Sequence, residues 1–361
     1  MDNSGLPLDF SSFDQGVRVP DYALWIEGAP VPAQLLRSIM SVSISQEANQ
    51  PASFTCRVYD PGFVLVDAGT GLFAEGRRVE IALGYVGDAM QTMISGEISA
   101  VAAELEPGGG LTLQVEGFDH LHAAARGTAY RQFAESKSDD AIVSEIARDL
   151  QLDAEVEATA TRTGERVQQH VSNLAFLQAI AADNDYQLWM EDRRLCFKRT
   201  RPGPRVALAR GRDLISFTAR LSTAGQVGAV EVRGWDAGQE QGFSYRAEAS
   251  RSPGYAARLA STGLAQVSGQ RDSPSERIIH AEGQVRSVEE ARTLAEAVLA
   301  EQRRSLFIAD GSAVGNPDLR VGSSVRLLNM WRFSDDYVVD SARHEIGPAG
   351  YRTTFRMRQH L

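Results

Sequence analysis

Short segments that alternate apolar and polar residues, separated by turn residues, dominate this sequence. They recur at 22–28, 39–44, 52–59, 78–83, 93–101 and 111–116, with Gly, Pro, Asn and Asp between them. Alternation with a period of two predicts strands with one buried face, and evenly spaced short strands are typical of an antiparallel sandwich or barrel. We therefore expect residues 21–125 to form a first β-barrel domain, preceded by an N-terminal arm at 1–20.

The apolar period changes in the middle of the chain and predicts an α+β insert at 126–200. Ser138 can cap a first helix, whose initial turn carries the acidic pair Asp139-Asp140. A second helix is expected from Ser172 to about 184, because its apolar residues fall on one face. A hairpin follows, with strands predicted at 186–190 and 194–198.

Strand patterns resume after the segment Pro202-Gly203-Pro204, which has the composition of a domain boundary. One helix interrupts them. Ser287 and Glu290 have the spacing of a capping box and predict a helix over 287–303. We expect 201–361 to form a second β-barrel domain that contains this inserted helix, so the fold class is mainly β with an α+β insert.

Two parts of the chain resemble each other in order and spacing. Residues 76–81 align with 322–327, and 97–109 align with 338–350 without a gap. Each copy predicts a strand led by Gly, a second strand, a turn with Pro and Gly, and a third strand. The identities are few, so two similar hairpins are an alternative to a duplication. Three copies of a chain with two equivalent domains would form a ring with six similar contacts.

The charge of the chain restricts its partners. The formal net charge of −10 argues against tight or sequence-specific nucleic-acid binding, whose affinity comes largely from Lys and Arg on phosphates. It is compatible with a passage that repels DNA, and we expect an acidic lumen if such a passage exists. Neither a run of about 20 apolar residues nor a secretory signal is present. We expect synthesis in the cytoplasm and no stable membrane insertion.

Candidate catalytic and metal-binding groups are sparse in the sequence. The segment 120–122, His-Leu-His, would place two imidazoles on one side of a strand, but no third ligand is evident nearby. The acidic pairs at 139–140 and 335–336 are sequence neighbours, whereas a glycosidase needs two carboxyls that face each other across a sugar. Cys56 and Cys196 lie in strand patterns typical of core side chains. We therefore expect no enzyme activity, catalytic residue, metal or cofactor.

Four aromatic residues are candidate interface anchors, because Trp and Tyr dominate buried contacts between subunits. They are Trp25, Trp331, Phe333 and Tyr337. Trp331 is the strongest candidate, since it shares its loop at 329–333 with two further apolar side chains that need cover. Packing in the core of the chain itself is the alternative for each residue.

Four segments carry a resemblance to a known family: 171–188, 230–236, 287–299 and 315–355. The second of them ends in Gly-Trp-Asp, and the third is a helix rich in Glu and Ala. Together they resemble the phage tail hub family, often called late control protein D, and the N-terminal half of type VI secretion VgrG spikes. The resemblance covers about 120–361, and the first domain fits by pattern only.

The resemblance implies a homotrimeric, pseudo-six-fold ring with two β-barrel domains in each chain. Such a baseplate hub lies between tail tube and spike and forms the central channel, through which DNA or protein cargo passes. The implied partners are Hcp-like tail tube subunits, a spike protein, baseplate wedge proteins and a tape measure protein. Related spikes continue into an oligonucleotide-binding-type barrel and a β-helix, whereas this sequence stops at Leu361. The spike is therefore expected to be a separate protein.

The function expected from the sequence is thus a structural hub of a contractile phage tail or a related injection system. Two alternatives stay open. A cell-wall hydrolase carried by the same particle should show a cleft with convergent groups of shifted pKa. A stand-alone carbohydrate-binding β protein should be a monomer with exposed aromatic platforms. The sequence does not distinguish a phage tail from a tailocin or an extracellular injection particle.

Overall fold

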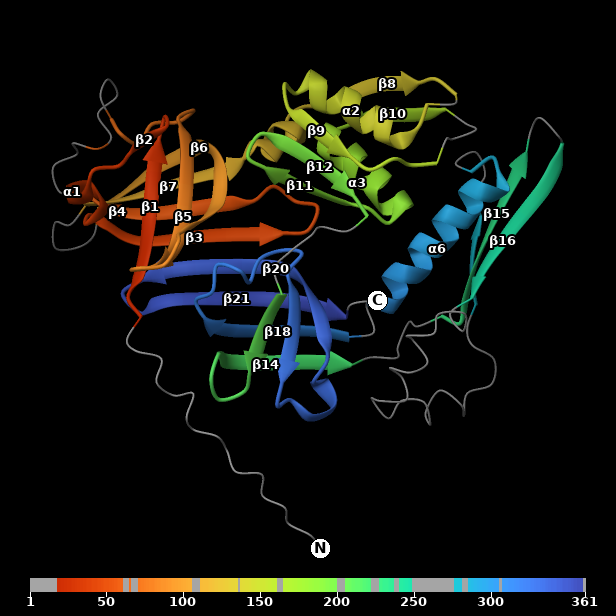
Figure 1. The fold of residues 1–361 in the computed structure, drawn as a ribbon. Helices are drawn as coiled ribbons and strands as arrows, with labels where there is room; N and C mark the ends of the chain where they lie inside the picture. Colours follow the sequence, from red (N-terminus) through yellow and green to blue (C-terminus); the bar gives the residue numbers. More distant parts are fainter. Residues whose placement is uncertain are drawn as a thin grey trace, which may run out of the picture.

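The computed structural model describes residues 18–60, 65, 71–105, 111–135, 137–160, 165–199, 205–221, 227–236, 240–248, 276–280, 285–304 and 307–359. Its largest feature is a curled sheet of 13 strands, with a few helices beside it (Figure 1). The predicted mainly β fold with an α+β insert is confirmed at this level. The predicted arm up to residue 17 and the Pro-Gly-Pro boundary lie outside the described residues.

The N-terminal part of the curled sheet, called module one here, follows the predicted alternation. On β3, Val42 and Ile44 are fully buried, while Ser41, Ser43 and Ser45 alternate with them on the opposite face. The strands occur in the order β3-β4-β7-β6-β5-β1-β2. The elements of module one are β1 (Pro20–Ile26), β2 (Ala29–Pro30), α1 (Ala33–Leu36), β3 (Ile39–Glu47), β4 (Ser53–Tyr59), β5 (Arg78–Tyr85), β6 (Gln91–Leu105) and β7 (Leu111–Asp119).

The C-terminal part, called module two, has the strand order β14-β18-β21-β20-β19-β13. Its core contains Phe307, Phe355 and Met357, all nearly without solvent contact. Its elements are β13 (Arg205–Ala209), β14 (Leu214–Leu221), β18 (Phe307–Val314), β19 (Ser324–Leu328), η4 (Trp331–Phe333), β20 (Asp336–Gly347) and β21 (Gly350–Gln359).

The two modules share one topology. Taken along the chain, β1, β3, β4, β5, β6 and β7 occupy the same places in module one as β13, β14, β18, β19, β20 and β21 in module two. One pair differs in direction, because β1 is antiparallel to β5 whereas β13 is parallel to β19.

Local details recur at the aligned positions as well. Gly76 and Gly322 have φ of 82° and 85°, a region that glycine adopts readily. The amide of Gly76 donates to the Ile98 carbonyl (2.8 Å), and the amide of Gly322 donates to the aligned Val339 carbonyl (3.0 Å). Because a chance pair of hairpins need not share strand order and these bonds, the structure supports a duplication.

The modules are joined edge to edge by β3 and β20, which lie side by side in Figure 1. The apolar core also crosses this seam, because Ile346 and Tyr351 of module two pack in the core of module one. The Tyr85 hydroxyl donates to the Gly315 carbonyl (2.7 Å) from the other side. The described strands of both modules therefore form one continuous curled sheet, and the division into two barrel domains stays a prediction.

The insert between the modules has its own core, built around Ile142, Ile146, Leu177 and Ile180. Ser172 caps α3 as predicted, since its hydroxyl accepts from the Ala175 amide (3.1 Å). The elements are η2 (His120–Ala125), β8 (Ala129–Phe133), α2 (Asp139–Asp149), β9 (Asp153–Val156), β10 (Arg166–Val171), α3 (Asn173–Asn184), β11 (Gln187–Glu191) and β12 (Arg194–Lys198).

Two local predictions in this region need correction. Ser138 is the N-cap of α2 but its side chain makes no capping bond. The segment 120–122 lies on a 3₁₀ helix and not on a strand, because the Asp119 carboxylate accepts from the Leu121 amide (3.0 Å) and starts a turn there. The two imidazoles therefore do not share a strand face.

A separate three-stranded sheet with one helix, called the α6 layer, is inserted between β14 and β18. It contains β15 (Ala229–Asp236), β16 (Gln241–Glu248), β17 (Glu276–His280) and α6 (Val288–Arg304). The predicted cap is confirmed, since the Ser287 hydroxyl accepts from the Glu290 amide (3.2 Å). The strand at 227–235 was expected in the second barrel. It lies in this separate sheet because Val230 and Val232 pack against α6.

Candidate interaction surfaces

The curled sheet presents one polar face, opposite its apolar core. Strand alternation places hydroxyl and charged side chains there from both modules. Arg343 donates to the Ser43 hydroxyl across the seam (3.0 Å), and Arg356 pairs with Asp310 (2.8 Å). A shallow groove of about 450 Å³ follows this face between β3, β4, β18, β20 and β21. A continuous polar sheet face of this kind is suited to line a water-filled space.

The predicted interface residues differ in exposure. Trp331 is 80% exposed, and its ring has the Arg210 guanidinium 4.9 Å from its centre. Trp25 and Phe333 are half-buried, and Phe333 packs beside Phe307. Tyr337 is only 3% exposed, stacks on Phe307 and donates to the Phe333 carbonyl. The burial of Tyr337 supports the alternative of a core residue, so only the other three offer surface to a partner.

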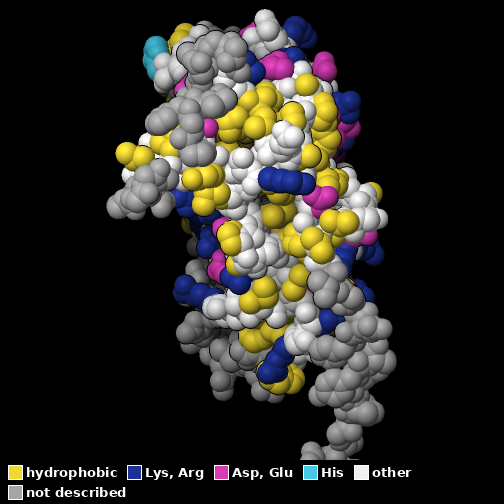
Figure 2. Space-filling view, turned by 90° about the vertical axis from the view of Figure 1, so that its left-hand side faces the viewer, with side chains coloured by type: hydrophobic (Ala, Val, Ile, Leu, Met, Phe, Trp, Pro, Cys, Tyr) yellow, Lys and Arg dark blue, Asp and Glu magenta, His cyan; other side chains and the backbone are white. Residues whose placement is uncertain are grey.

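Further apolar residues are exposed that were not predicted to lie on the surface. Leu105 at the end of β6 is 73% exposed, and Ile215 at the start of β14 is 52% exposed. Figure 2 shows the side of the molecule on which module one lies above module two, and hydrophobic side chains recur there among charged ones. In the aligned repeat, Leu105 corresponds to Ile346, which is buried at the contact between the modules. The alignment therefore indicates that Leu105 also needs a partner to cover it.

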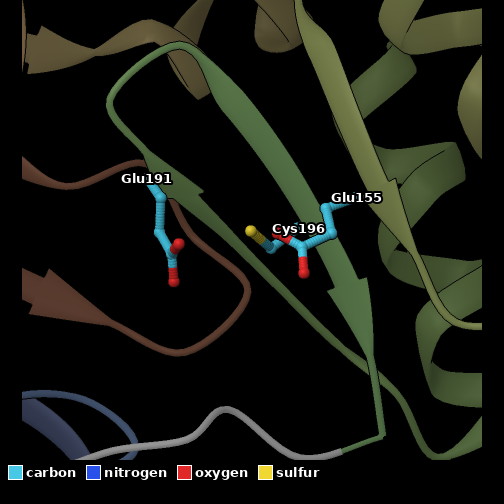
Figure 3. A group of neighbouring side chains, drawn as sticks. All are labelled: Glu155, Glu191 and Cys196. Carbon is cyan, nitrogen blue, oxygen red and sulfur yellow. The ribbon is translucent and has the colours of Figure 1, made fainter.

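One group of potential metal ligands exists among the described residues, formed by Glu155, Glu191 and Cys196 on the sheet of the insert (Figure 3). Their ligand atoms lie within 4.8 Å of one another. The Glu155 carboxylate already pairs with Arg194 (3.3 Å) and Lys198. Burial and the two carboxylates raise the pKa of the Cys196 thiol to about 11, and a metal ligand must be the thiolate. The group is therefore better explained as an ion-pair cluster.

Neither His120 nor His122 belongs to such a group within the described ranges. Burial lowers the pKa of both imidazoles. His122 stacks on Phe118 with ring centres 4.3 Å apart, and His120 lies 3.9 Å from the Glu97 carboxylate. Both residues thus have ordinary packing environments.

A polar cavity of about 390 Å³ lies between the insert and module one. It is the candidate active site of the hydrolase alternative, because several carboxylates line it. Its lining includes Glu47, Glu191, Asp192 and Asp119. Asp119 is fixed by the amides of Ala52 and Leu121, both at 3.0 Å, so its carboxylate holds the start of η2. A carboxylate committed to two backbone donors is a structural group, which weakens the case for an acid-base pair in this cavity.

No helix within the described ranges has the length and apolar character that crossing a bilayer requires. Among the described residues, the exposed sheet faces and sheet edges are suited to contacts between protein subunits.

Comparison with solved structures shows that the chain has a phage tail and baseplate hub-like fold. It is similar over 94% of its length to the 43 kDa tail protein of prophage MuSo2 from Shewanella oneidensis, at 12% identity and a TM-score of 0.68, covering 98% of that chain. A tail protein from Neisseria meningitidis MC58 gives 12% identity and a TM-score of 0.65, with 94% and 96% covered.

A third similar structure is an Escherichia coli component of the type VI secretion system, itself structurally similar to bacteriophage T4 tail proteins. It gives 11% identity and a TM-score of 0.56, with 94% of this chain and 77% of that one covered. A search of curated proteins gave no match. The family model described as the Alg8 N-terminal domain matches residues 17–347, and the chain belongs to that family.

Proposed function

We propose that this chain is a structural hub subunit of a contractile phage tail or a related injection system. Three copies form a ring that joins the six-fold tail tube to the three-fold spike. The observation that carries this proposal is the pair of sheet modules with one strand order, joined edge to edge in a single sheet. Six such modules from three chains present six similar surfaces to a tube, while the ring keeps three-fold symmetry.

The polar face of the curled sheet is the candidate wall of the central channel. Its hydroxyl and charged side chains need contact with water, whereas the opposite face is the apolar core. In module two this face carries Arg343, Arg352 and Arg356 beside Asp310 and Glu345. The channel that we propose therefore has mixed charge, in place of the acidic lumen expected from the net charge alone. Mixed charge suits the passage of DNA or protein cargo without sequence-specific binding.

The partners that we propose are Hcp-like tube subunits on one side of the ring and a separate spike protein on the other. Baseplate wedge proteins and a tape measure protein complete the proposed surroundings. The exposed loop around Trp331 lies between β19 and β20, at the same place in its module as the β5–β6 turn in module one. We propose that these turns form the rim that contacts the tube.

Sedimentation of the full chain, together with electron microscopy of negatively stained particles, tests this proposal. We expect a species of three times the 39.3 kDa chain mass and ring-shaped particles with a central channel. The cell-wall hydrolase alternative predicts instead release of soluble fragments from purified peptidoglycan. A monomer at every concentration, with such release or with carbohydrate binding, would contradict the hub.

A further inference from the structure

The seam inside one chain shows how two of these modules join. The second half of β20 pairs antiparallel with β3, from Ser341 opposite Glu47 to Ile346 opposite Val42. The inward-facing residues of this seam are buried, with Ile44 and His344 fully covered. The seam therefore converts two sheet edges into the interior of one sheet.

Each strand of the seam has a counterpart in the other module. The second half of β6, residues 100–105, corresponds to 341–346 of β20, and β14 corresponds to β3. Both β6 and β20 have a register shift just before these segments, at Ile98/Ala100 and Val339/Ser341. The strands β3 and β14 both have one at their second residue. Shared irregularities at aligned positions fix the correspondence to single residues.

The counterparts lack the partner that the seam strands have. Among the described residues, 100–105 of β6 pair only with β7. β14 pairs with β18 and, at Leu214 alone, forms an isolated bridge to Arg210, so the rest of its other edge is open. Leu105 is 73% exposed, although its counterpart Ile346 is 7% exposed. Ala103 is exposed as well, although its counterpart His344 is fully buried. An exposed edge strand readily pairs with another chain, so these two edges need a partner.

We propose that β14 of one copy pairs antiparallel with residues 100–105 of β6 in the next copy, in the register of the seam. This inference rests on the proposed function and gives the ring its contact between chains. The register places Leu105 opposite Phe217 and Ala103 opposite Ala219 on the apolar face. Glu104 lies opposite Thr218 on the polar face, diagonal to Arg220, which adds an attraction between opposite charges.

The pairing is head to tail, because each copy has one β14 edge and one β6 edge, and the β14 edge of one copy contacts the β6 edge of the next. A head-to-tail contact closes into a ring or continues as a filament, depending on the rotation between copies. If the rotation equals that between the two modules of one chain, three copies give six seams, alternately within and between chains. Both open edges of every copy are then covered.

Disulfide formation between copies tests the register. The Ala48 amide donates to the Asp340 carbonyl (2.9 Å), so these two residues form a hydrogen-bonded pair. Hydrogen-bonded and non-hydrogen-bonded pairs alternate along an antiparallel ladder. Glu345 and Ser43, five residues further along the seam, therefore form a non-hydrogen-bonded pair. Such pairs have their Cα atoms about 4.5 Å apart, close enough for a disulfide. Their counterparts are Glu104 and Thr218, both exposed.

The test variant therefore carries Glu104→Cys and Thr218→Cys, and is exposed to a mild oxidant. Both native cysteines are buried in the chain and should not interfere. We expect covalent species that end at three chains. Co-expressing the two single variants should give a covalent dimer with one copy of each, since the contact is head to tail.

Two matched controls give the disulfide yield expected for a correct register and for a shifted register. Ser43→Cys with Glu345→Cys places the same geometry inside one chain and should form an intramolecular disulfide. Ala103→Cys with Thr218→Cys slips the register by one residue, which turns one thiol to the other face, and should give little product.

The outcomes separate this inference from the proposed function. A trimer that forms the intramolecular control disulfide but no disulfide between 104 and 218 overturns the strand pairing and leaves the hub proposal standing. A covalent ladder that passes three chains supports the pairing and overturns the trimer. A chain that stays monomeric and forms only the intramolecular disulfide contradicts both.

Discussion

At the scale of single residues, Arg166, whose side chain is 11% exposed, connects α2 and α3 of the insert. Arg166 forms two hydrogen bonds with Asp139 (2.8 and 2.9 Å) and one with Asp183 (2.8 Å). Asp139 is 2% exposed and also accepts from the Asn184 side chain (2.7 Å), so removing Arg166 leaves a buried carboxylate without its paired cation. We expect Arg166→Ala to lower the free energy of unfolding by about 3–5 kcal/mol, measured by urea denaturation.

A surface pair of the same chemistry provides the control. Arg326 contacts Asp336 with two bonds of 2.8 Å, but the two side chains are 65% and 41% exposed. We expect Arg326→Ala to cost less than about 1 kcal/mol, because water already solvates both charges. Equal losses in the two variants would show that burial of Asp139 does not determine the effect.

A buried histidine links the stability of the seam to pH. His344 lies beside the Tyr351 hydroxyl (2.9 Å) and the Thr353 hydroxyl (3.1 Å). Burial lowers its pKa from 6.5 to about 3. Between these values the unfolded chain binds a proton that the folded chain does not. The contribution is therefore complete above pH 6.5 and is lost as the pH falls towards 3.

The expected loss from this histidine is about 1.4 kcal/mol per pH unit across that window. His344→Gln cannot titrate, and its side-chain oxygen can still accept from Tyr351. Urea denaturation at several pH values should give this variant a shallower slope between pH 6 and 4 than the parent chain. Parallel slopes would mean that His344 is protonated in the folded state.

At the scale of structural elements, the repeated glycine turn should have the same energetic role in both modules. Gly76 and Gly322 have φ above 80°, where a side chain is strained. We expect Gly76→Ala and Gly322→Ala each to cost about 1–2 kcal/mol in urea denaturation. Gly242→Ala on β16 is the control, since its added Cβ meets nothing closer than 3.8 Å. A cost at only one of the two turns would contradict their equivalence.

Sequence periodicity was a good guide to elements with a strong local signal. The helices beginning after Ser172 and Ser287 were predictable because apolar spacing and a hydroxyl cap agree there. The place of the strand at 229–236 was not, because its alternation fits any half-buried sheet and only packing against α6 decides it. The turn at 120–122 depends on one Asp119 bond, which no periodicity reveals.

The candidate surfaces were less predictable than the elements. Trp331 was a clear candidate because three apolar residues share its loop, and it is indeed exposed. Tyr337 lies six residues further along the chain, but strand alternation turns its ring into the core. The open edges of β6 and β14 depend on which strands pair over long stretches of sequence, such as β14 with β18 and β3 with β20, and such pairing has no local signature.

At the scale of the whole molecule, one sheet connects the two ends of the chain. Force applied to module one passes to module two through the β3–β20 backbone bonds and the shared core around Tyr351. A hub that moves with tube and spike needs such a continuous connection. The insert is tied to the same seam, because the Asn49 side chain of the β3–β4 turn accepts from the Leu188 amide (2.7 Å).

The rim of the proposed ring gives the last prediction. Trp331 is 80% exposed and contacts Arg210, so Trp331→Ala should change the free energy of unfolding by no more than about 0.5 kcal/mol. If the ring binds the tube through this rim, the substitution removes an aromatic anchor and weakens that binding by about 2 kcal/mol. Titration of the hub with tube subunits from the same particle measures this. Trp235→Ala, in the α6 layer and 53% exposed, should bind tube normally. Equal weakening in both variants would point to a general surface effect and remove the rim from the model.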